Sequence, residues 1–443
     1  MIDPDELARL LPDFLPRQRW YGHTGSELDS VAIVDFEVLR DGLPGLVWAL
    51  VEATFRGGAT ATFQVPVGLR PLEATERFLE GKGRGFLGDI DTVEGPALVY
   101  DALVDPALAL TMLARVAPDA HVEMVRPLNL EQSNTSIVYD ERLIMKVFRR
   151  VADGPNPDVE VTAGLARVGF EHVAAPVATW SKDRRDLAVV RVFLSGATDG
   201  WHLALTSLRD LYDCRADPSL CGGDFAPEAA RLGDVTAAMH VALAEAFGTG
   251  PADPDGWADA MHAHLARVPV EGFDPGAVAR AYDRVRGLDA AGPALRIHGD
   301  YHLGQTLRTD SGWYVLDLEG EPAVPLRERR LPSSTLRDVA GILRSFHYAA
   351  QAGLVERGEE ADEELAGLAR VWEDRATSSF LDGYFHHDGI EALLPPDDDA
   401  RRALLDAFLL AKAVYEVGYE RAHRPAWTWI PLAAVTRILG GSP

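Results

Sequence analysis

One short polar segment and the apolar run after it constrain this chain most strongly. The segment is Ile297-His298-Gly299-Asp300-Tyr301-His302-Leu303-Gly304-Gln305. It sets an amide, Gln305, five residues after a carboxylate, Asp300. A second apolar run, Trp313 to Leu318, then carries Asp317 near its end. The order of carboxylate, amide and strand-end carboxylate predicts one chemical site built on a short β insert.

This order is the layout of the phosphoryl-transfer loop in protein kinases. In H-R-D-x-x-x-x-N the Asp orients the acceptor hydroxyl and the amide binds metal, while a later strand-end Asp holds metal on the phosphates. Here His298-Gly299-Asp300 replaces the first triplet and Gln305 replaces the Asn. We predict Asp300 as the catalytic residue, with Gln305 and Asp317 as ligands of Mg²⁺. Glu319, which faces the same way on a strand, is either a further metal ligand or a turn residue.

Length and composition predict a soluble globular chain. At 443 residues the chain is long enough for two or three lobes with large cores. A net charge of −25 disfavours nucleic acid and anionic membrane as partners. No membrane-spanning apolar run and no signal peptide are visible, and the only cysteines are Cys214 and Cys221. We therefore expect two free thiols and a cytoplasmic location.

Hydrophobic periodicity predicts an α+β chain in three parts. Residues 1–120 are expected to form an N-terminal cap and the start of the N-lobe, residues 121–197 a β-rich nucleotide-binding N-lobe, and residues 198–443 a helical C-lobe with the catalytic loop and sugar site. The cap should contain a helix at 4–11, strands at 31–39, 45–55 and 60–67, and a mostly helical stretch at 89–113. Long helices are expected at 223–246, 255–266, 275–288, 336–350, 361–384 and 401–421.

Two features of the middle part suggest a nucleotide site. Lys146 lies in the apolar strand 143–148. A Lys there either faces solvent or serves a buried anion; in kinases it contacts the nucleotide phosphates and pairs with a helix Glu, here Glu160. The turn at 131–136 lacks glycine, yet its side chains and backbone amides can bind phosphate; the alternative is a polar turn that caps its own backbone. The turn residues assigned to the nucleotide are Ser133, Asn134, Thr135 and Ser136.

Segments along nearly the whole chain resemble actinobacterial maltokinases. They are Arg17–Tyr21, Gln132–Ser136, Lys146–Arg150, Asn156–Glu160, Thr198–Trp201, His298–Gln305, Glu319–Pro322, Leu336–Gly341 and Tyr415–Glu420. The resemblance implies a bilobal protein-kinase-like fold, similar to aminoglycoside phosphotransferases, with an N-terminal cap subdomain. Asp338 resembles the residue that steadies the catalytic loop in such enzymes.

The resemblance also implies an activity. It is the ATP-dependent phosphorylation of maltose at its anomeric hydroxyl, which gives maltose 1-phosphate for α-glucan and glycogen synthesis. ATP and Mg²⁺ are the implied cofactors, and trehalose synthase is a candidate partner. The residues assigned to the sugar are His298, Lys412, Tyr415, Glu416 and Tyr419.

Two alternatives remain open from the residues. The first is a kinase for another small acceptor such as glucosamine or an aminoglycoside, whose positive charge Glu319, Glu321 and Glu416 would suit. The second is a pseudokinase or binding module. The complete set of Lys146, Asp300, Gln305 and Asp317 argues against a module without turnover.

Overall fold

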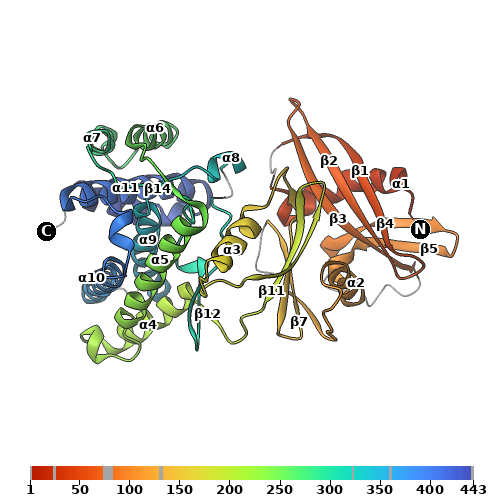
Figure 1. The fold of residues 1–443 in the computed structure, drawn as a ribbon, viewed down its shortest axis with the longest axis horizontal. Coiled ribbons are helices and arrows are strands. Elements are labelled where there is room, and N and C mark those ends of the chain that lie inside the picture. The colour runs from red at the N-terminus through yellow and green to blue at the C-terminus, as the bar shows by residue number, and fades with distance from the viewer. Residues whose placement is uncertain are drawn as a thin grey trace. The chain divides into compact units, whose positions relative to one another are not determined.

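The computed structural model describes residues 2–22, 26–72, 83–128, 133–321, 324–358 and 362–440. It divides into two compact units (Figure 1). The first contains Met1–Glu160 and Ala174–Ser195, and the second contains Val161–Val173 and Gly196–Pro443. Residues 161–173 of the predicted N-lobe thus belong to the second unit, and the predicted domain boundaries at 120 and 197 stay a prediction. Strands dominate the first unit and helices the second, as expected for an α+β chain.

The first unit contains a sheet of six antiparallel strands. Its order is β1-β2-β3-β5-β4, from Leu28–Arg40, Gly45–Phe55, Thr60–Pro71, Gly95–Asp101 and Phe86–Thr92, and β9 (Arg150–Val151) pairs with β3. Successive side chains of β2 point to opposite faces. Val47, Ala49 and Val51 therefore pack with helix α1 (Pro4–Phe14), while Leu46, Trp48 and Leu50 pack with helix α2 (Pro106–Val116).

A second, five-stranded antiparallel sheet holds Lys146 near its centre. Its order is β10-β11-β8-β7-β6, from Pro176–Lys182, Arg185–Val192, Leu143–Val147, Thr135–Tyr139 and Val125–Leu128. Helix α2, which Figure 1 labels, shares one hydrophobic core with residues from both sheets. This common core holds the cap against the five-stranded sheet. Helix α3 (Pro157–Arg167) follows β9.

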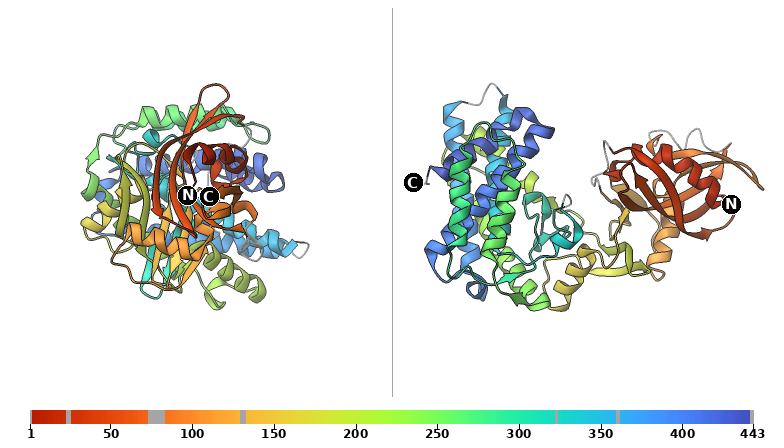
Figure 2. Two further views of the ribbon diagram at one scale, coloured as in Figure 1. Left: turned by 90° about the vertical axis from the view of Figure 1, so that its right-hand side faces the viewer. Right: turned by 90° about the horizontal axis from the view of Figure 1, so that it is seen from above.

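The second unit is a helical body built around one buried helix. Helix α9 (Leu336–Arg357) is buried at every residue from Asp338 to Ala350. Helices α4 (Gly200–Cys214), α10 (Glu363–Phe385) and α11 (Asp398–His423) pack directly against it, and several long helices of this unit run side by side (Figure 2). The further helices are α5 (Ala226–Phe247), α6 (Pro254–Leu265), α7 (Pro275–Arg286), α8 (Leu326–Arg329) and α12 (Trp429–Leu439).

Short strands complete the second unit. Strands β12 (Thr198–Asp199), β15 (Thr306–Thr309) and β16 (Gly312–Val315) form one small antiparallel sheet, and β13 (Thr249–Gly250) pairs with β14 (Ala294–Leu295). Across the described ranges, none of the helices is long and apolar enough to cross a membrane.

The structure corrects two predictions about the cap. The stretch 89–113 is not mostly helical, because its first half forms the hairpin of β4 and β5 and only its second half enters α2. Thr92 closes that hairpin by accepting a hydrogen bond from the amide of Glu94 and donating one to the carbonyl of Gly95. Helix α1 also runs past Pro12 to Phe14, since burial of the Phe14 side chain offsets the hydrogen bond that proline removes.

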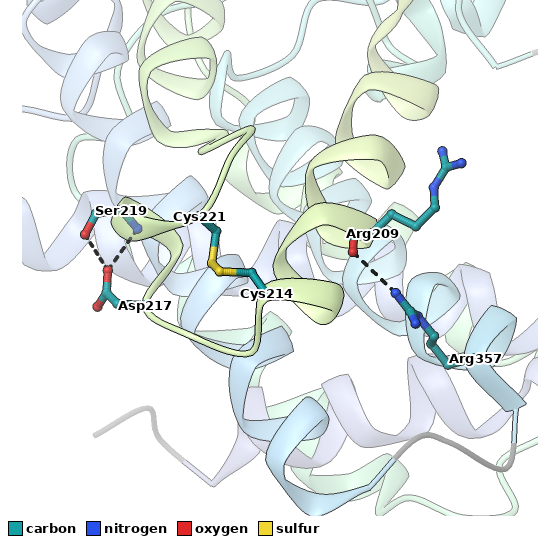
Figure 3. The surroundings of a disulfide bond; sticks show 6 residues. All are labelled: Arg209, Cys214, Asp217, Ser219, Cys221 and Arg357. Atoms are coloured by element: carbon teal, nitrogen blue, oxygen red, sulfur yellow. Dashed lines mark hydrogen bonds between the residues drawn. A yellow bond between two sulfur atoms is a disulfide. The ribbon is translucent and has the colours of Figure 1, made fainter.

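The prediction of two free thiols is wrong. A disulfide joins Cys214, the last residue of α4, to Cys221 (Figure 3). Arg215 ends α4 in the left-handed conformation, with φ of 50°, and Asp217 caps the following turn by accepting from the amide of Ser219. These turns return the chain until the two Cα atoms lie 6.0 Å apart, within the usual range for a disulfide. A seven-residue spacing alone carries no signal of that geometry.

Candidate active site

A hairpin brings the two predicted metal ligands to one edge. Gln305 immediately precedes β15, and Asp317 lies two residues after β16. The two strands pair from Thr306 with Val315, and the amide of Leu316 donates to the carbonyl of Gln305 at 2.9 Å. Asp317 adopts a left-handed backbone with φ of 55°, which turns the chain immediately after the strand. The amide and the carboxylate therefore belong to the same end of the hairpin.

The loop that carries Asp300 is fastened to helix α9 by Asp338. One carboxylate oxygen of Asp338 accepts from the amide of His298 at 2.8 Å, and the other accepts from the amide of Gly299 at 2.9 Å. His240 contributes its Nε2 at 3.2 Å from the same carboxylate. Burial opposes ionisation of Asp338, but His240, His298 and the backbone amide of Gly299 hold its pKa below the ordinary value. These contacts confirm that Asp338 steadies the loop.

His298 is buried and makes contacts within the protein, and its predicted binding of substrate stays a prediction. Its side chain is 1% exposed. Its Nε2 lies 2.8 Å from the carbonyl of Leu316, and its Nδ1 lies 3.4 Å from the amide of Asp300. Both ring nitrogens are thus used inside the protein. The imidazole spans the space between the Asp300 loop and the end of β16, and it sets the loop against the hairpin.

Asp300 is half-buried and lies beside a cation. The Nζ atom of Lys412, from α11, is 3.5 Å from its Oδ1. Burial disfavours the charged form of Asp300, but Lys412 and the neighbouring His302 and His298 lower its pKa below the ordinary value. Lys412 also lies 4.9 Å from the ring centre of Tyr415. Lys412 therefore favours the ionised form of the half-buried carboxylate that we predict to be catalytic.

Glu321, which the sequence analysis named only for a cationic acceptor, is also a member of this cluster. Its Oε1 accepts from the hydroxyl of Tyr415 at 3.2 Å. Burial and the negative charge of Asp300 raise the pKa of Glu321, against the opposing influence of Lys412. The signal in the sequence was its place in the segment after Asp317. Lys412 and Tyr415 are brought to Asp300 as expected.

Glu416 points elsewhere. It is 9% exposed, and its Oε2 accepts from Nε and Nη2 of Arg344 at 2.9 and 2.6 Å. This ion pair joins α11 to the buried helix α9, and the predicted binding of substrate by Glu416 stays a prediction. Tyr419, by contrast, is 44% exposed, and its ring stacks on Tyr415 and on His423.

In the first unit, Lys146 forms an ion pair with Asp158. Its Nζ lies 3.2 Å from Oδ2 of Asp158, and Nη1 of Arg191 lies 3.1 Å from the same oxygen. Asp158 is fully buried; burial alone would raise its pKa, but Arg191 and Lys146 together lower it. Neither Asp158 nor Arg191 was assigned from the sequence, although Asp158 opens the same helix as Glu160. The pairing of Lys146 with Glu160 stays a prediction.

The polar turn is only partly described, since Glu131 and Gln132 lie outside the described residues. In the rest of the turn, Nδ2 of Asn134 donates to the hydroxyl of Ser133 at 3.1 Å, and the hydroxyl of Thr135 accepts from Nε of Arg149 at 2.8 Å. Ser136 is buried in β7. Phosphate binding by Ser133, Asn134, Thr135 and Ser136 stays a prediction.

The donor set at the hairpin suits a hard divalent cation. Gln305 and Asp317 offer oxygen atoms only, which is the preference of Mg²⁺. One carboxylate oxygen of Glu319 lies within 4.8 Å of one from Asp317, so a second carboxylate is close enough to share an ion. The residues present therefore fit the predicted metal.

Comparison with known proteins shows what the chain resembles. Residues 14–105 match the maltokinase N-terminal cap domain. A glucosamine kinase of Streptacidiphilus jiangxiensis is 33% identical over 356 residues, which are 76% of this chain and 78% of that protein. A glucosamine kinase of Mycolicibacterium smegmatis is 29% identical over 349 residues, covering 74% and 82% of the two chains.

The solved structures confirm the predicted kinase-like fold with its cap. A crystal form of glucosamine kinase aligns over 98% of this chain and 99% of its own, with a TM-score of 0.71 and 24% identity. A glucosamine kinase in complex with glucosamine, ADP and inorganic phosphate aligns over the same shares, with a TM-score of 0.66 and 23% identity. The chain therefore belongs to the family that includes these glucosamine kinases, and it is a kinase-like phosphotransferase with a maltokinase-type N-terminal cap.

Proposed function

We propose that this protein transfers the γ-phosphoryl group of ATP to the anomeric hydroxyl of maltose and so supplies maltose 1-phosphate for α-glucan and glycogen synthesis. The contact between Lys412 and Asp300 is the observation that carries the choice of acceptor. It places a fixed positive charge 3.5 Å from the carboxylate that would receive the hydroxyl. A neutral, hydroxyl-rich sugar suits that setting better than a cationic one.

The chemistry follows from charge and position. Asp300, held ionised, accepts a hydrogen bond from the sugar hydroxyl and takes its proton late in transfer. Gln305 and Asp317 would hold Mg²⁺, which when bound neutralises charge on the phosphoryl oxygens. Lys146 and the turn at 133–136 would contact the nucleotide phosphates. Positioning and electrostatic stabilisation supply most of the acceleration in this class of reaction.

The acceptor side is built from α11. Tyr415 and Tyr419 stack with ring centres 6.4 Å apart, and 44% of Tyr419 is exposed. Aromatic faces pack against the C–H faces of a sugar ring, while Lys412 and Glu321 can hydrogen-bond its hydroxyls. Because Lys412 carries its charge on the same face, an ammonium group bound there would be repelled.

Glucosamine is the second candidate acceptor. Two related proteins are named glucosamine kinase, and Glu321 supplies a carboxylate in the same cluster as Asp300. If Glu321 is ionised with substrate bound, it offers a partner for an amino group. The maltokinase-type cap and the charge of Lys412 favour maltose over this alternative.

The proposal also includes ATP as the donor, a cytoplasmic location where ATP is available, and trehalose synthase as a candidate partner.

The test is an acceptor screen with a coupled ADP assay, using maltose, glucosamine, glucose and an aminoglycoside at equal concentration. The phosphorylated product is then identified by ³¹P and ¹H NMR, which report the position of the ester. Phosphorylation of glucosamine with none of maltose would refute the acceptor assignment.

A matched variant sharpens the test. Lys412→Met removes the charge near Asp300 and keeps the length of the side chain. If Lys412 selects against cations, the variant gains relative activity on glucosamine and loses it on maltose. An unchanged ratio of kcat/KM for the two sugars would show that Lys412 does not set the choice of acceptor.

A further inference from the structure

Arg149 is a buried arginine three residues beyond Lys146 in the sequence. It is 1% exposed, and a buried guanidinium is stable only with charged and polar partners. Its Nη2 lies 2.5 Å from Oδ2 of Asp101, and its Nε donates to the hydroxyl of Thr135 at 2.8 Å. The guanidinium carbon lies 5.0 Å from the ring centre of Trp20. Each of these contacts fixes the same planar group.

The partners of Arg149 come from two parts of the first unit. Trp20 and Asp101 fall within the matched cap, residues 14–105. Thr135 belongs to the turn that we assign to the nucleotide phosphates. One guanidinium therefore connects the cap to that turn. Since the hydroxyl oxygen of Thr135 accepts from Arg149, its single proton remains able to donate to an anion.

A buried glutamine of the cap makes a second connection. Gln64, in β3, is fully buried, and its Nε2 donates to the carbonyls of Phe148 and Leu187 at 2.6 and 2.5 Å. The backbone N–H of Gln64 donates to the carbonyl of Arg149 at 3.0 Å. The two residues of β3 just before Gln64, Thr62 and Phe63, pair with β9. The cap thus holds the end of β8, the strand of Lys146, against the neighbouring strand β11.

We propose that Arg149 is a positioning residue through which the cap orders the nucleotide-phosphate site. The cap junction, defined as Gln64, Asp101, Thr135 and Arg149, fixes the end of the Lys146 strand and the hydroxyl of Thr135 together. The inference rests on the proposed function in one respect, the assignment of Lys146 and the turn to the nucleotide phosphates. It gives the cap a role in binding ATP although Asp101 need not touch the nucleotide.

The test weakens the junction from the cap side. Asp101→Asn keeps the shape of the side chain and an oxygen for the amide of Leu103, but it removes the charge that faces Arg149. We expect the Kd for MgATP, measured by calorimetry without sugar, to rise about tenfold, the loss typical of one hydrogen bond to a charged group. The KM for the sugar should not change. Arg149→Lys keeps the charge but loses the planar fork, so it should raise the Kd for MgATP in the same way and leave the KM for the sugar unchanged.

Asp105→Asn is the matched control in the same cap. Asp105 is also buried and pairs with Arg70 at 2.7 Å, and it caps α2 through the amide of Ala107. It has no contact with the turn among the described residues. This variant should lower the unfolding temperature and leave the Kd for MgATP unchanged, because its role is structural.

The outcomes separate this inference from the proposed function. If Asp101→Asn and Arg149→Lys fold and bind MgATP as tightly as Asp105→Asn does, the junction has no positioning role. If Lys146→Met also binds MgATP like the wild type, the phosphate site lies elsewhere and both proposals fail. An acceptor other than maltose leaves the titration unaffected, since no sugar is present.

Discussion

Asp338→Asn tests whether the Asp300 loop is held in place by a charged anchor. The wild-type carboxylate accepts from the backbone amides of His298 and Gly299 at 2.8 and 2.9 Å while 1% exposed. An Asn has nearly the same shape but only one acceptor oxygen. In either orientation its NH₂ group would face the backbone N–H of His298 or of Gly299, and that N–H would lose its acceptor.

The magnitude follows from those contacts. Loss of one charge-assisted hydrogen bond costs roughly 1.5 to 3 kcal/mol, and the buried amide left without a partner costs about 1 to 3 kcal/mol more. A total of roughly 2.5 to 6 kcal/mol is enough to let the loop move away from α9. A misplacement of about 1 Å at the reacting carboxylate costs about a hundredfold in rate. We therefore expect kcat to fall about a hundredfold with little change in the Kd for MgATP.

The assay is steady-state ADP release with saturating maltose, together with calorimetric titration of MgATP and a thermal unfolding curve. Arg337→Gln is the matched control, since this residue precedes Asp338 on the same helix but is exposed. A folded Asp338→Asn protein with kcat within threefold of the control would refute the anchoring argument. A large loss in the control as well would point to α9 in general and not to the carboxylate.

Four further perturbations test the site and the fold. Asp300→Asn should abolish turnover and leave the Kd for MgATP unchanged, and measurable sugar phosphate from this variant would remove it from the catalytic position. Asp317→Ala should abolish Mg²⁺-dependent nucleotide binding in calorimetry, and an unchanged affinity would place the metal elsewhere. Lys412 lowers the pKa of Asp300, so Lys412→Met should raise that pKa and move the acid limb of kcat/KM to higher pH; an unmoved limb contradicts the pairing. Cys214→Ser should lower the free energy of unfolding by about 2 kcal/mol, the chain-entropy value for a short loop, and make it insensitive to dithiothreitol; the same response to reductant as the wild type would exclude the disulfide.

Elements with one strong local signal could be predicted from the sequence. Gly57 and Gly58 separate the strands predicted at 45–55 and 60–67, and the structure pairs these strands as β2 and β3 with both glycines at positive φ. The long amphipathic helices α5, α10 and α11 were expected within a few residues of their observed ends. The hairpin of β4 and β5 was missed because its two-residue turn, Val93 and Glu94, lacks a strong turn signal. Helix α4 was missed although Asp199 caps it, since its apolar positions are interrupted by polar ones.

For the candidate site, too, some features could be predicted from the sequence and others depend on tertiary packing. The order of Asp300, Gln305 and Asp317 along the chain predicted that the hairpin would gather them, because neighbouring strands fix where their ends lie. The partners of Glu416 and Lys146 could not be predicted, since Arg344 and Asp158 meet them through tertiary packing. On a helix each residue turns about 100°, so Glu416 next to Tyr415 faces α9 while Tyr415 faces Glu321. The spacing of three and four residues between Lys412, Tyr415, Glu416 and Tyr419 predicts one helix face, whereas the structure pairs Glu416 with Arg344 of α9.

Under the proposed function, the charge of Lys412 would link catalysis to the choice of substrate. The same cation that keeps Asp300 ionised also occupies the space where an amino group of a sugar would seek a carboxylate. Glu321 can serve such a group only by giving up its hydrogen bond with Tyr415 or by ionising against the charge of Asp300. A cationic acceptor would therefore have to overcome two costs that a neutral disaccharide avoids. It follows that acceptor selectivity should depend on the residues at 412 and 321, whereas the Asp300 loop and the hairpin ligands should be common to both activities.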